Sequence, residues 1–398
     1  MYRMYDLDMK EIPFPEGLVP LDIFISSISK NRTSGSIEGS HRKINYGSTS
    51  GDRDVELTML LRSYDTQDYR LLRDEVYEMF NRHDTFYIVE EYQRGKRLLV
   101  SVDDKYIPER FPGDQKHAAA TINCSTAELP FMESIGTSAD IDNPELIPIV
   151  PGLWVQGYWA LDTGKGTSNS QTNIRTNIDI KIPLSPGKDY RLTSFGDYEA
   201  RLNMYSDEEY LGYVHSGKND SKDFKVLEGA TYGRISVRQY KGNEEMTPSM
   251  IGSDINISLK RSGVGILFED NLWGFGMGLI YDDDSLEYTH IGTSFRIFNP
   301  GIDIHPFEQF LKIEISDVRG SDIFLQLQNR TTGDFLRITE PVGPDQVIKI
   351  DGAVITSNNL NYLRKTNRKF ISLKHGWNNF RLTGAVSAKV GFDFRFYY

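Results

Sequence analysis

A single cysteine, Cys124, stands in a chain of 398 residues. One thiol cannot form an internal disulfide framework, and it provides no cysteine-based zinc site. Cys124 lies within an alternating run from Ala118 to Ala127, so we expect it to be a small buried strand residue.

Long hydrophobic runs are also missing. No stretch approaches the roughly 20 apolar residues that a membrane-spanning helix needs. The first six residues, Met1 to Asp6, contain no hydrophobic core of a signal peptide. We therefore expect neither a membrane span nor a secretory leader.

Basic charge is scarcer than acidic charge. The chain has 45 Lys and Arg residues against 56 Asp and Glu residues, which gives a net charge of −11. A protein that binds nucleic acid tightly needs a basic surface, so the composition argues against a tightly bound DNA or RNA partner. It leaves open an acidic channel wall past which DNA slides without specific binding.

Catalytic and metal-binding motifs are absent. There is no Gly-x-Ser-x-Gly, no phosphate-binding loop and no His-Glu-x-x-His. The acidic run Asp282–Asp284 lacks the alternating ligands of a calcium loop, and we expect it to be a solvated hairpin tip. We expect no enzyme, no catalytic or metal-binding residue and no cofactor. Seven scattered histidines show no metal-ligand spacing: His41, His83, His117, His215, His290, His305 and His375.

Aromatic residues, by contrast, are plentiful, with 22 Tyr and 21 Phe, and they favour strands. The last residues alternate, so that Val390, Phe392, Phe394 and Phe396 share one face. The sequence therefore predicts a mainly β protein that ends in a compact β sandwich with its C-terminus tied down.

The first part of the chain, 1–140, is predicted to mix strands with one helix. Asp65 is a candidate N-cap, and a buried face with helical spacing follows it: Tyr69, Leu72, Val76, Met79 and Phe80. The segment Thr33–Gly51 is rich in Gly, Ser and Arg. It predicts either a long loop or an extended arm that orders only against a neighbour. Strands are expected at 23–29, 55–62 and 116–128, with a hairpin over 86–107.

Shifts in composition divide the rest of the chain. Asp and Pro residues between 139 and 150 indicate a linker, and turn signals then separate the short strands of an all-β unit. Asp351-Gly352 predicts a two-residue hairpin turn in the last part. We therefore expect domains at 1–140, 148–262 and 284–398, with 263–283 as a connecting segment that packs on the first.

Six segments follow one another along the chain: Pro130–Thr137, Asn271–Leu279, Phe295–Gly301, Asn329–Asp334, Gly376–Phe380 and the terminal Phe396–Tyr398. In this order they resemble the distal tail proteins of long-tailed phages (siphoviruses) that infect Gram-positive bacteria. In that family, segments like Ser134–Thr137 and Trp273 are near neighbours in sequence, whereas here a long stretch separates them, which indicates an inserted module. Trp273 and Trp377 are expected to be structural.

The resemblance implies a structural role in the virion. The N-terminal domain would form a belt, six copies of which close a ring around the tail channel, and the C-terminal domain would be a galectin-like sandwich. Such a homohexameric hub of the distal tail, or baseplate, joins the tail tube protein to the tail-tip protein. In some phages it also carries receptor-binding proteins. It would be assembled in the host cytoplasm, and DNA would pass through it.

The inserted module, 148–262, resembles carbohydrate-binding jelly rolls at Ile182–Tyr190, Arg201–Ser206 and Tyr232–Val237. Alternation predicts one polar face on two strands. The tyrosine rings of this face can stack on sugars, and its arginine side chains can bind hydroxyl groups or anions. Host cell-wall glycans are therefore the expected ligands. The alternatives are a solvated face or a patch covered by another subunit. We expect Trp154, Tyr158 and Trp159 in the core. The candidate face comprises Arg201, Asn203, Tyr205, Tyr232, Arg234, Arg238 and Tyr240.

Two functions follow. The first is a phage tail hub whose module participates in host adsorption by binding wall glycans. The second is a stand-alone carbohydrate-binding or cell-wall-hydrolase-associated protein.

Overall fold

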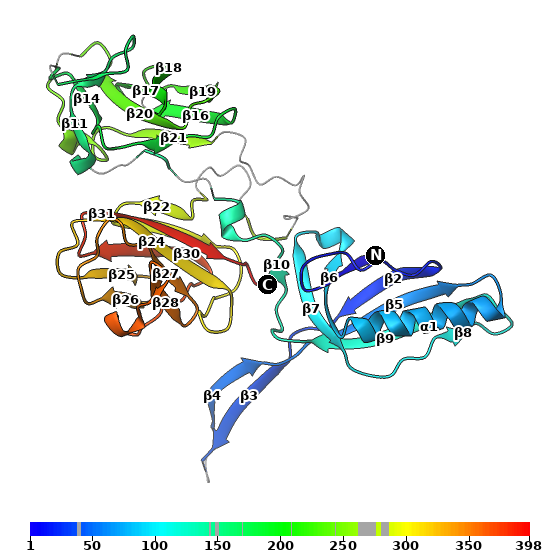
Figure 1. Ribbon diagram of the computed structural model, residues 1–398. Coiled ribbons are helices and arrows are strands. Elements are labelled where there is room, and N and C mark those ends of the chain that lie inside the picture. The colour runs from blue at the N-terminus through cyan, green and yellow to red at the C-terminus, as the bar shows by residue number, and fades with distance from the viewer. Residues whose placement is uncertain are drawn as a thin grey trace. The chain divides into compact units, whose positions relative to one another are not determined.

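The computed structural model describes residues 1–37, 41–142, 145–147, 151–168, 170–207, 209–242, 244–261, 276–279 and 286–398. The predicted roles of Trp273 and of Asp282–Asp284 lie outside these residues. The chain divides into two compact units, and the first unites residues 1–136, 268–279 and 395–398. Strands dominate both units, and α1 is the single α-helix among the described residues, which confirms the predicted mainly β class (Figure 1).

The first unit is built on an antiparallel sheet with the strand order β1-β6-β7-β9-β5-β2. The predicted strands are found, but the first begins and ends earlier than expected and pairs with β5 from Leu18 onwards. The strands are β1 (Tyr2–Tyr5), β2 (Leu18–Ile25), β5 (Asp54–Arg62), β6 (Thr85–Glu90), β7 (Lys96–Val102) and β9 (His117–Thr126), with β8 (Glu109–Arg110) on β9 and β10 (Glu133–Ser134) on β7.

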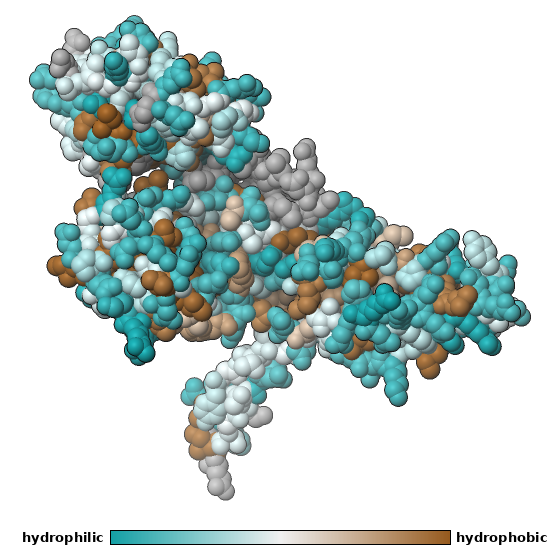
Figure 2. Space-filling view, viewed as in Figure 1, coloured by the Kyte–Doolittle hydropathy of each residue, from teal (hydrophilic) through white to brown (hydrophobic). Residues whose placement is uncertain are grey.

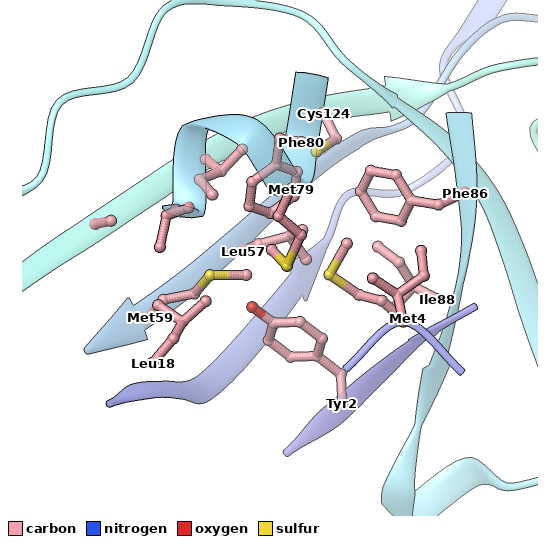
Figure 3. Close-up of a cluster of buried hydrophobic side chains, with 14 of the residues drawn as sticks. Tyr2, Met4, Leu18, Leu57, Met59, Met79, Phe80, Phe86, Ile88 and Cys124 are labelled. Carbon is pink, nitrogen blue, oxygen red and sulfur yellow. The ribbon is translucent and has the colours of Figure 1, made fainter. Parts of the chain in front are cut away.

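Helix α1 (Thr66–Arg82) packs its buried face into the core of this sheet. Asp65 caps the helix as predicted, because its carboxylate accepts the N–H groups of Gln67 and Asp68, both at 2.8 Å. The side chains buried along the helix are the five that the spacing predicts: Tyr69, Leu72, Val76, Met79 and Phe80. Figure 3 shows Met79 and Phe80 among sheet residues such as Leu57 and Phe86.

The C-terminal part of the second unit is a sandwich of two sheets. Phe380 on one sheet lies 4.8 Å, ring centre to ring centre, from Phe392 on the other. The first sheet contains β22 (Thr289–Ile291), β31 (Ser387–Phe394), β24 (Leu311–Arg319), β27 (Ile348–Asp351), β28 (Val354–Ser357) and β29 (Leu360–Asn361). The second contains β23 (Ser294–Asn299), β30 (Gly376–Thr383), β25 (Leu325–Asn329) and β26 (Phe335–Ile338).

Two predictions bear on this sandwich. The turn at Asp351-Gly352 is confirmed, because it joins the paired strands β27 and β28. The terminal strand buries Val390, Phe392 and Phe394 as predicted, yet it ends at Phe394. Phe396 is buried as well, but it belongs to the first unit and not to the sandwich.

The module before the sandwich also has two sheets around one core. Leu192 and Leu259 from the smaller sheet pack with Leu202 and Ile235 from the larger one. The larger sheet contains β11 (Trp154–Gln156), β14 (Asn173–Thr176), β20 (Tyr232–Gln239), β17 (Tyr198–Ser206) and β18 (Glu209–Ser216), with β15 (Ile182–Pro183) paired to β20. The smaller contains β19 (Ser221–Lys225), β16 (Asp189–Ser194) and β21 (Ile257–Arg261).

Short elements complete the chain. β3 (Lys30–Ser36) pairs with β4 (Lys43–Ser50), and β12 (Tyr158–Trp159) pairs with β13 (Gly166–Thr167). Single turns of 3-10 helix occur at Glu91–Gln93, Ser138–Asp140, Pro151–Leu153, Pro248–Met250 and Leu363–Lys365. Within the described residues, no helix has the length and hydrophobicity needed to cross a bilayer.

Candidate functional site

The predicted polar residues of the module do come together on one sheet face. Strands β17 and β20 pair so that Asn203 lies opposite Arg234 and Tyr205 lies opposite Tyr232. Glu199 likewise lies opposite Arg238. Since paired residues point to the same side of a sheet, the predicted face is real.

The expectation of a face open along its whole length was wrong. Asn203, Tyr205, Tyr232 and Arg234 are each between 0% and 5% exposed. The β12–β13 hairpin covers these side chains. Asn203 Nδ2 donates to the carbonyl oxygen of Ala160 at 3.0 Å, and the Tyr205 hydroxyl donates to the carbonyl oxygen of Gly164 at 2.6 Å. Alternation within a strand defines a face but does not reveal what packs over it.

Backbone geometry brings this hairpin close to the sheet. Gly157 has a φ of +120°, and a Cβ atom there would lie 1.7 Å from the carbonyl oxygen of Thr167. Only glycine fits this approach. Trp159 then lies buried in the hairpin, and Trp154 is buried in β11, as predicted for both. Tyr158 is exposed, which corrects its expected core position.

Arginines and aromatic rings alternate beneath the hairpin, and we call these residues the arginine–aromatic cluster: Trp159, Arg175, Tyr205, Tyr232 and Arg234. The guanidinium carbons of Arg175 and Arg234 lie 4.6 and 4.8 Å from the Trp159 ring centre. Tyr205 and Tyr232 stack at 5.2 Å. Burial raises the pKa of Tyr205 to about 12, so its hydroxyl stays protonated. The protein's own arginines fill this aromatic site, which makes it part of the module's packing.

The other end of the same sheet face is accessible. Arg201, Arg238 and Tyr240 lie there, and β18 adds Tyr213 opposite Asn203 and His215 opposite Arg201. We call these five residues the open face. Tyr213 is 47% exposed and Tyr240 is 39% exposed.

A buried carboxylate organises the charges of the open face. Glu199 accepts from Arg238 Nε at 2.5 Å and lies 3.6 Å from His215 Nε2. Partial burial, and then the charge of Arg238, lower the pKa of Arg201 from its ordinary value. Arg201 has no carboxylate partner of its own among the described residues, so its guanidinium is available to an anionic or hydroxyl-bearing ligand.

Sequence reasoning missed Tyr213 and His215. They alternate on strand β18, which was a detectable signal, but their place beside Arg201 depends on the pairing of β17 with β18. The covering hairpin had no comparable signal, because β12 and β13 contribute only two paired residues each. Groups of three or more His, Cys, Asp or Glu side chains that could hold a metal ion do not occur in the described part of the chain.

A second candidate surface lies in the first unit. In the described part of the chain, strands β3 and β4 pair only with each other, and they form an arm that projects from the N-terminal sheet (Figure 1). Of the two predicted alternatives, the arm is the one observed. It exposes Ile37, Ile44 and Tyr46, the last to 67%, and Figure 2 shows one hydrophobic patch near the far end of the arm. A two-stranded ribbon without a core is marginally stable alone.

Residues 19–124, which include this arm and α1, match the family model of the phage tail protein RIFT-related domain. Over these residues, the chain is similar to a phage tail domain. The resemblance to a siphophage tail protein that the sequence predicts is thereby confirmed. No curated protein matches the sequence.

Solved structures of phage tails show similarity as well. The chain is similar to the Dit protein of phage SPP1, described as a hub adsorption apparatus of phages that infect Gram-positive bacteria. The two share 9% identity over 100% of this chain and 99% of that chain, with a TM-score of 0.41. A chain of the activated phage p2 baseplate shares 10% identity over 65% of this chain and 96% of its own, with a TM-score of 0.29.

Proposed function

We propose that this protein is a hub at the distal end of a phage tail, where six copies close a ring between the tail tube and the tail-tip protein. The observation that carries the proposal is the phage tail domain at residues 19–124, whose edge strand β2 leads towards the projecting arm. As proposed partners, receptor-binding proteins would attach to the outside of this ring.

Strand edges and exposed hydrophobic side chains supply the contacts for ring closure. Among the residues that the structure describes, β2 pairs with β5 alone, which leaves its other edge unpaired there, and β2 exposes Leu21 and Phe24. The arm exposes Ile44 and Tyr46. An arm that docks on the sheet of the next copy forms a heterologous contact, and such a contact closes into a ring when repeated around an axis. DNA would pass the acidic wall of this ring without specific binding.

The test replaces residues 31–49 of the arm by a short Gly-Ser linker. We expect native mass spectrometry to show six protomers for the wild type and single protomers for the variant, and negative-stain images to show rings only for the wild type. Tyr92→Ala removes an even more exposed ring elsewhere in the unit, and this variant should still assemble. A wild type that remains a monomer alongside tail-tip proteins would contradict the hub and favour the stand-alone carbohydrate-binding alternative.

We further propose that the open face of the module binds host cell-wall glycans. Exposed tyrosine rings stack on sugars, and the Arg201 guanidinium donates to hydroxyl or phosphate groups. The covered residues Tyr232 and Arg234 are poor test positions, because their loss would disturb the module's packing. The ligand surface therefore comprises Arg201, Tyr213 and Tyr240 together with Arg238.

The matched experiment compares Arg201→Ala/Tyr240→Ala with Lys222→Ala/Phe195→Ala, which removes one cation and one exposed ring at β19 and after β16 of the smaller sheet. We expect the first double variant to lose at least tenfold in binding to purified host walls while rings still form. Equal binding by both variants would remove the open face as the site.

A further inference from the structure

The C-terminal sandwich presents a second polar surface, on the outer side of the sheet β23-β30-β25-β26. Pairing places Arg296 beside Asn379, Arg381 beside Gln328, and Gln326 beside Arg337. Arg330 follows β25 directly and donates its backbone N–H to the carbonyl oxygen of Asn379 at 2.7 Å. We call Arg296, Arg330, Arg337 and Arg381 the arginine face. All four are exposed, and the outward positions of the four strands hold no carboxylate.

The opposite sheet of the same sandwich shows a different arrangement of charge. There, Lys312 pairs with Asp351 at 3.2 Å and Lys349 with Glu314 at 3.6 Å, so acids on neighbouring strands neutralise its cations. Within the described residues, no ion pair joins Arg296, Arg330, Arg337 or Arg381 to a carboxylate. The arginine face is thus locally cationic in a chain whose net charge is −11.

A depression of about 680 Å³ lies at one end of this face. The backbones of Arg296 and Arg330 flank β30 on either side, about 10 Å apart at two strand spacings. Both side chains therefore reach the depression between them. Its lining combines cationic, amide, hydroxyl and aromatic groups: Ser294, Phe295, Arg296, Arg330, Thr331, Asn379 and Phe380.

Ring contacts hold two of the guanidinium groups in place. Arg296 lies 4.0 Å from the ring centre of half-buried Trp377, which itself packs at 5.1 Å against Phe298. Arg337 lies 4.1 Å from the ring centre of Phe324. Stacking orders a guanidinium while its N–H groups, which lie in its own plane, stay available to an anion. Less conformational entropy is then lost when a ligand binds.

We infer that the arginine face binds a hydroxyl-bearing phosphodiester polymer. Arginine forks match phosphate oxygens, while Asn379, Thr331 and Ser294 can form hydrogen bonds with the hydroxyl groups of the polymer in the same depression. Arg381 and Arg337 continue the positive charge across neighbouring strands, so a polymer with repeated charges gains contacts that a single sugar phosphate does not. The hydroxyl and amide groups beside the guanidinium groups suit a polymer that carries hydroxyl groups as well as phosphates. This site is separate from the open face of the module and does not depend on it.

The test measures binding of the full chain to poly(glycerol phosphate), with neutral dextran and poly-glutamate as comparison polymers. We expect at least tenfold weaker binding of poly(glycerol phosphate) by Arg296→Ala/Arg330→Ala/Arg381→Ala and a shallower dependence on salt. Lys312→Ala/Lys349→Ala/Lys389→Ala, on the opposite sheet, should bind within twofold of wild type. Arg330→Ala/Arg381→Ala, which keeps the stack on Trp377, should show an intermediate loss.

Hydrogen exchange locates the bound polymer. Protection by poly(glycerol phosphate) is expected in peptides that cover 294–299 and 376–383, independently of any protection at 198–206 in the module. Absence of wild-type binding, equal binding by the arginine and lysine variants, or protection confined to the module would overturn the inference. Binding of poly-glutamate as tight as that of poly(glycerol phosphate) would also overturn it, in favour of an acidic protein partner.

Discussion

Ser134 and Phe396 form a reciprocal pair of hydrogen bonds although 262 residues separate them in the chain. The Phe396 N–H donates to Ser134 Oγ at 2.9 Å, and the Ser134 N–H donates to the Phe396 carbonyl oxygen at 2.8 Å. Met132 and Tyr398 exchange backbone bonds in the same way, and the Tyr398 hydroxyl reaches the carbonyl oxygen of Met277. The first unit is therefore assembled from three separate stretches of chain.

Loss of the Phe396 ring should destabilise this unit substantially. Phe396 is fully buried, and Phe396→Ala leaves a cavity that costs about 3–5 kcal/mol. Ser134→Ala leaves a buried N–H without its acceptor and should cost about 1–3 kcal/mol. Urea unfolding followed by circular dichroism measures both. Val386→Ala, at an exposed position, should change the free energy of unfolding by less than about 0.5 kcal/mol, and an equal effect of all three variants would contradict this interpretation.

The buried ring of Trp159 should stabilise the module. Its ring is 1% exposed and lies against Arg175 and Arg234. We expect Trp159→Ala to lower the free energy of unfolding by about 3–5 kcal/mol and to increase proteolysis within 154–239. Tyr158→Ala, next to it but exposed, is the control. Unchanged protease resistance of the Trp159 variant would show that the hairpin does not cover the arginine–aromatic cluster in solution.

Cys124 should be chemically inert in the folded protein. It is buried on β9, and burial raises the pKa of its thiol to about 12. The thiolate is the reactive form, so a disulfide reagent at pH 8 should modify less than about a tenth of the protein in the time that fully labels the unfolded chain. Rapid labelling of the native protein would place Cys124 at an accessible site.

Glu145 should make the second unit less stable as pH rises. Burial raises its pKa to about 7, even though its Oε1 accepts the N–H groups of Ile147 and Leu259. Because the folded state binds this proton more tightly than the unfolded state, the stabilisation is fully present below about pH 4.5 and is lost as pH rises to 7. The change is at most about 3 kcal/mol.

Glu145→Gln should remove that slope, since the amide oxygen can still accept both N–H groups without a charge. Thermal unfolding between pH 5 and pH 8 measures it, with the exposed Glu228→Gln as the control. A variant that keeps the wild-type slope would assign the pH dependence to another group.

Local patterns predicted much of the fold. Three features depend only on neighbours within a few positions, so local sequence was enough to predict them: the cap at Asp65, the five buried residues of α1 and the turn at Asp351-Gly352. The open face was predicted in part: alternation placed Arg201 and Arg238 on one side of the sheet, and only pairing with β18 added Tyr213 and His215. The terminal strand was predicted to continue to Tyr398, four residues past its observed end at Phe394, because Phe396 continues the alternation yet packs in another unit.

The sequence by itself determined that the fold is mainly β, that a helix follows Asp65, and that the chain resembles phage tail proteins. These depend on residue type and short spacing, which act through local sterics and burial. Only the tertiary structure decided that Tyr232 and Arg234 lie beneath a hairpin while Arg201 remains open, and that Phe396 returns to Ser134. Contacts between distant segments leave no periodic trace in either segment, because each depends on side chains that the other contributes.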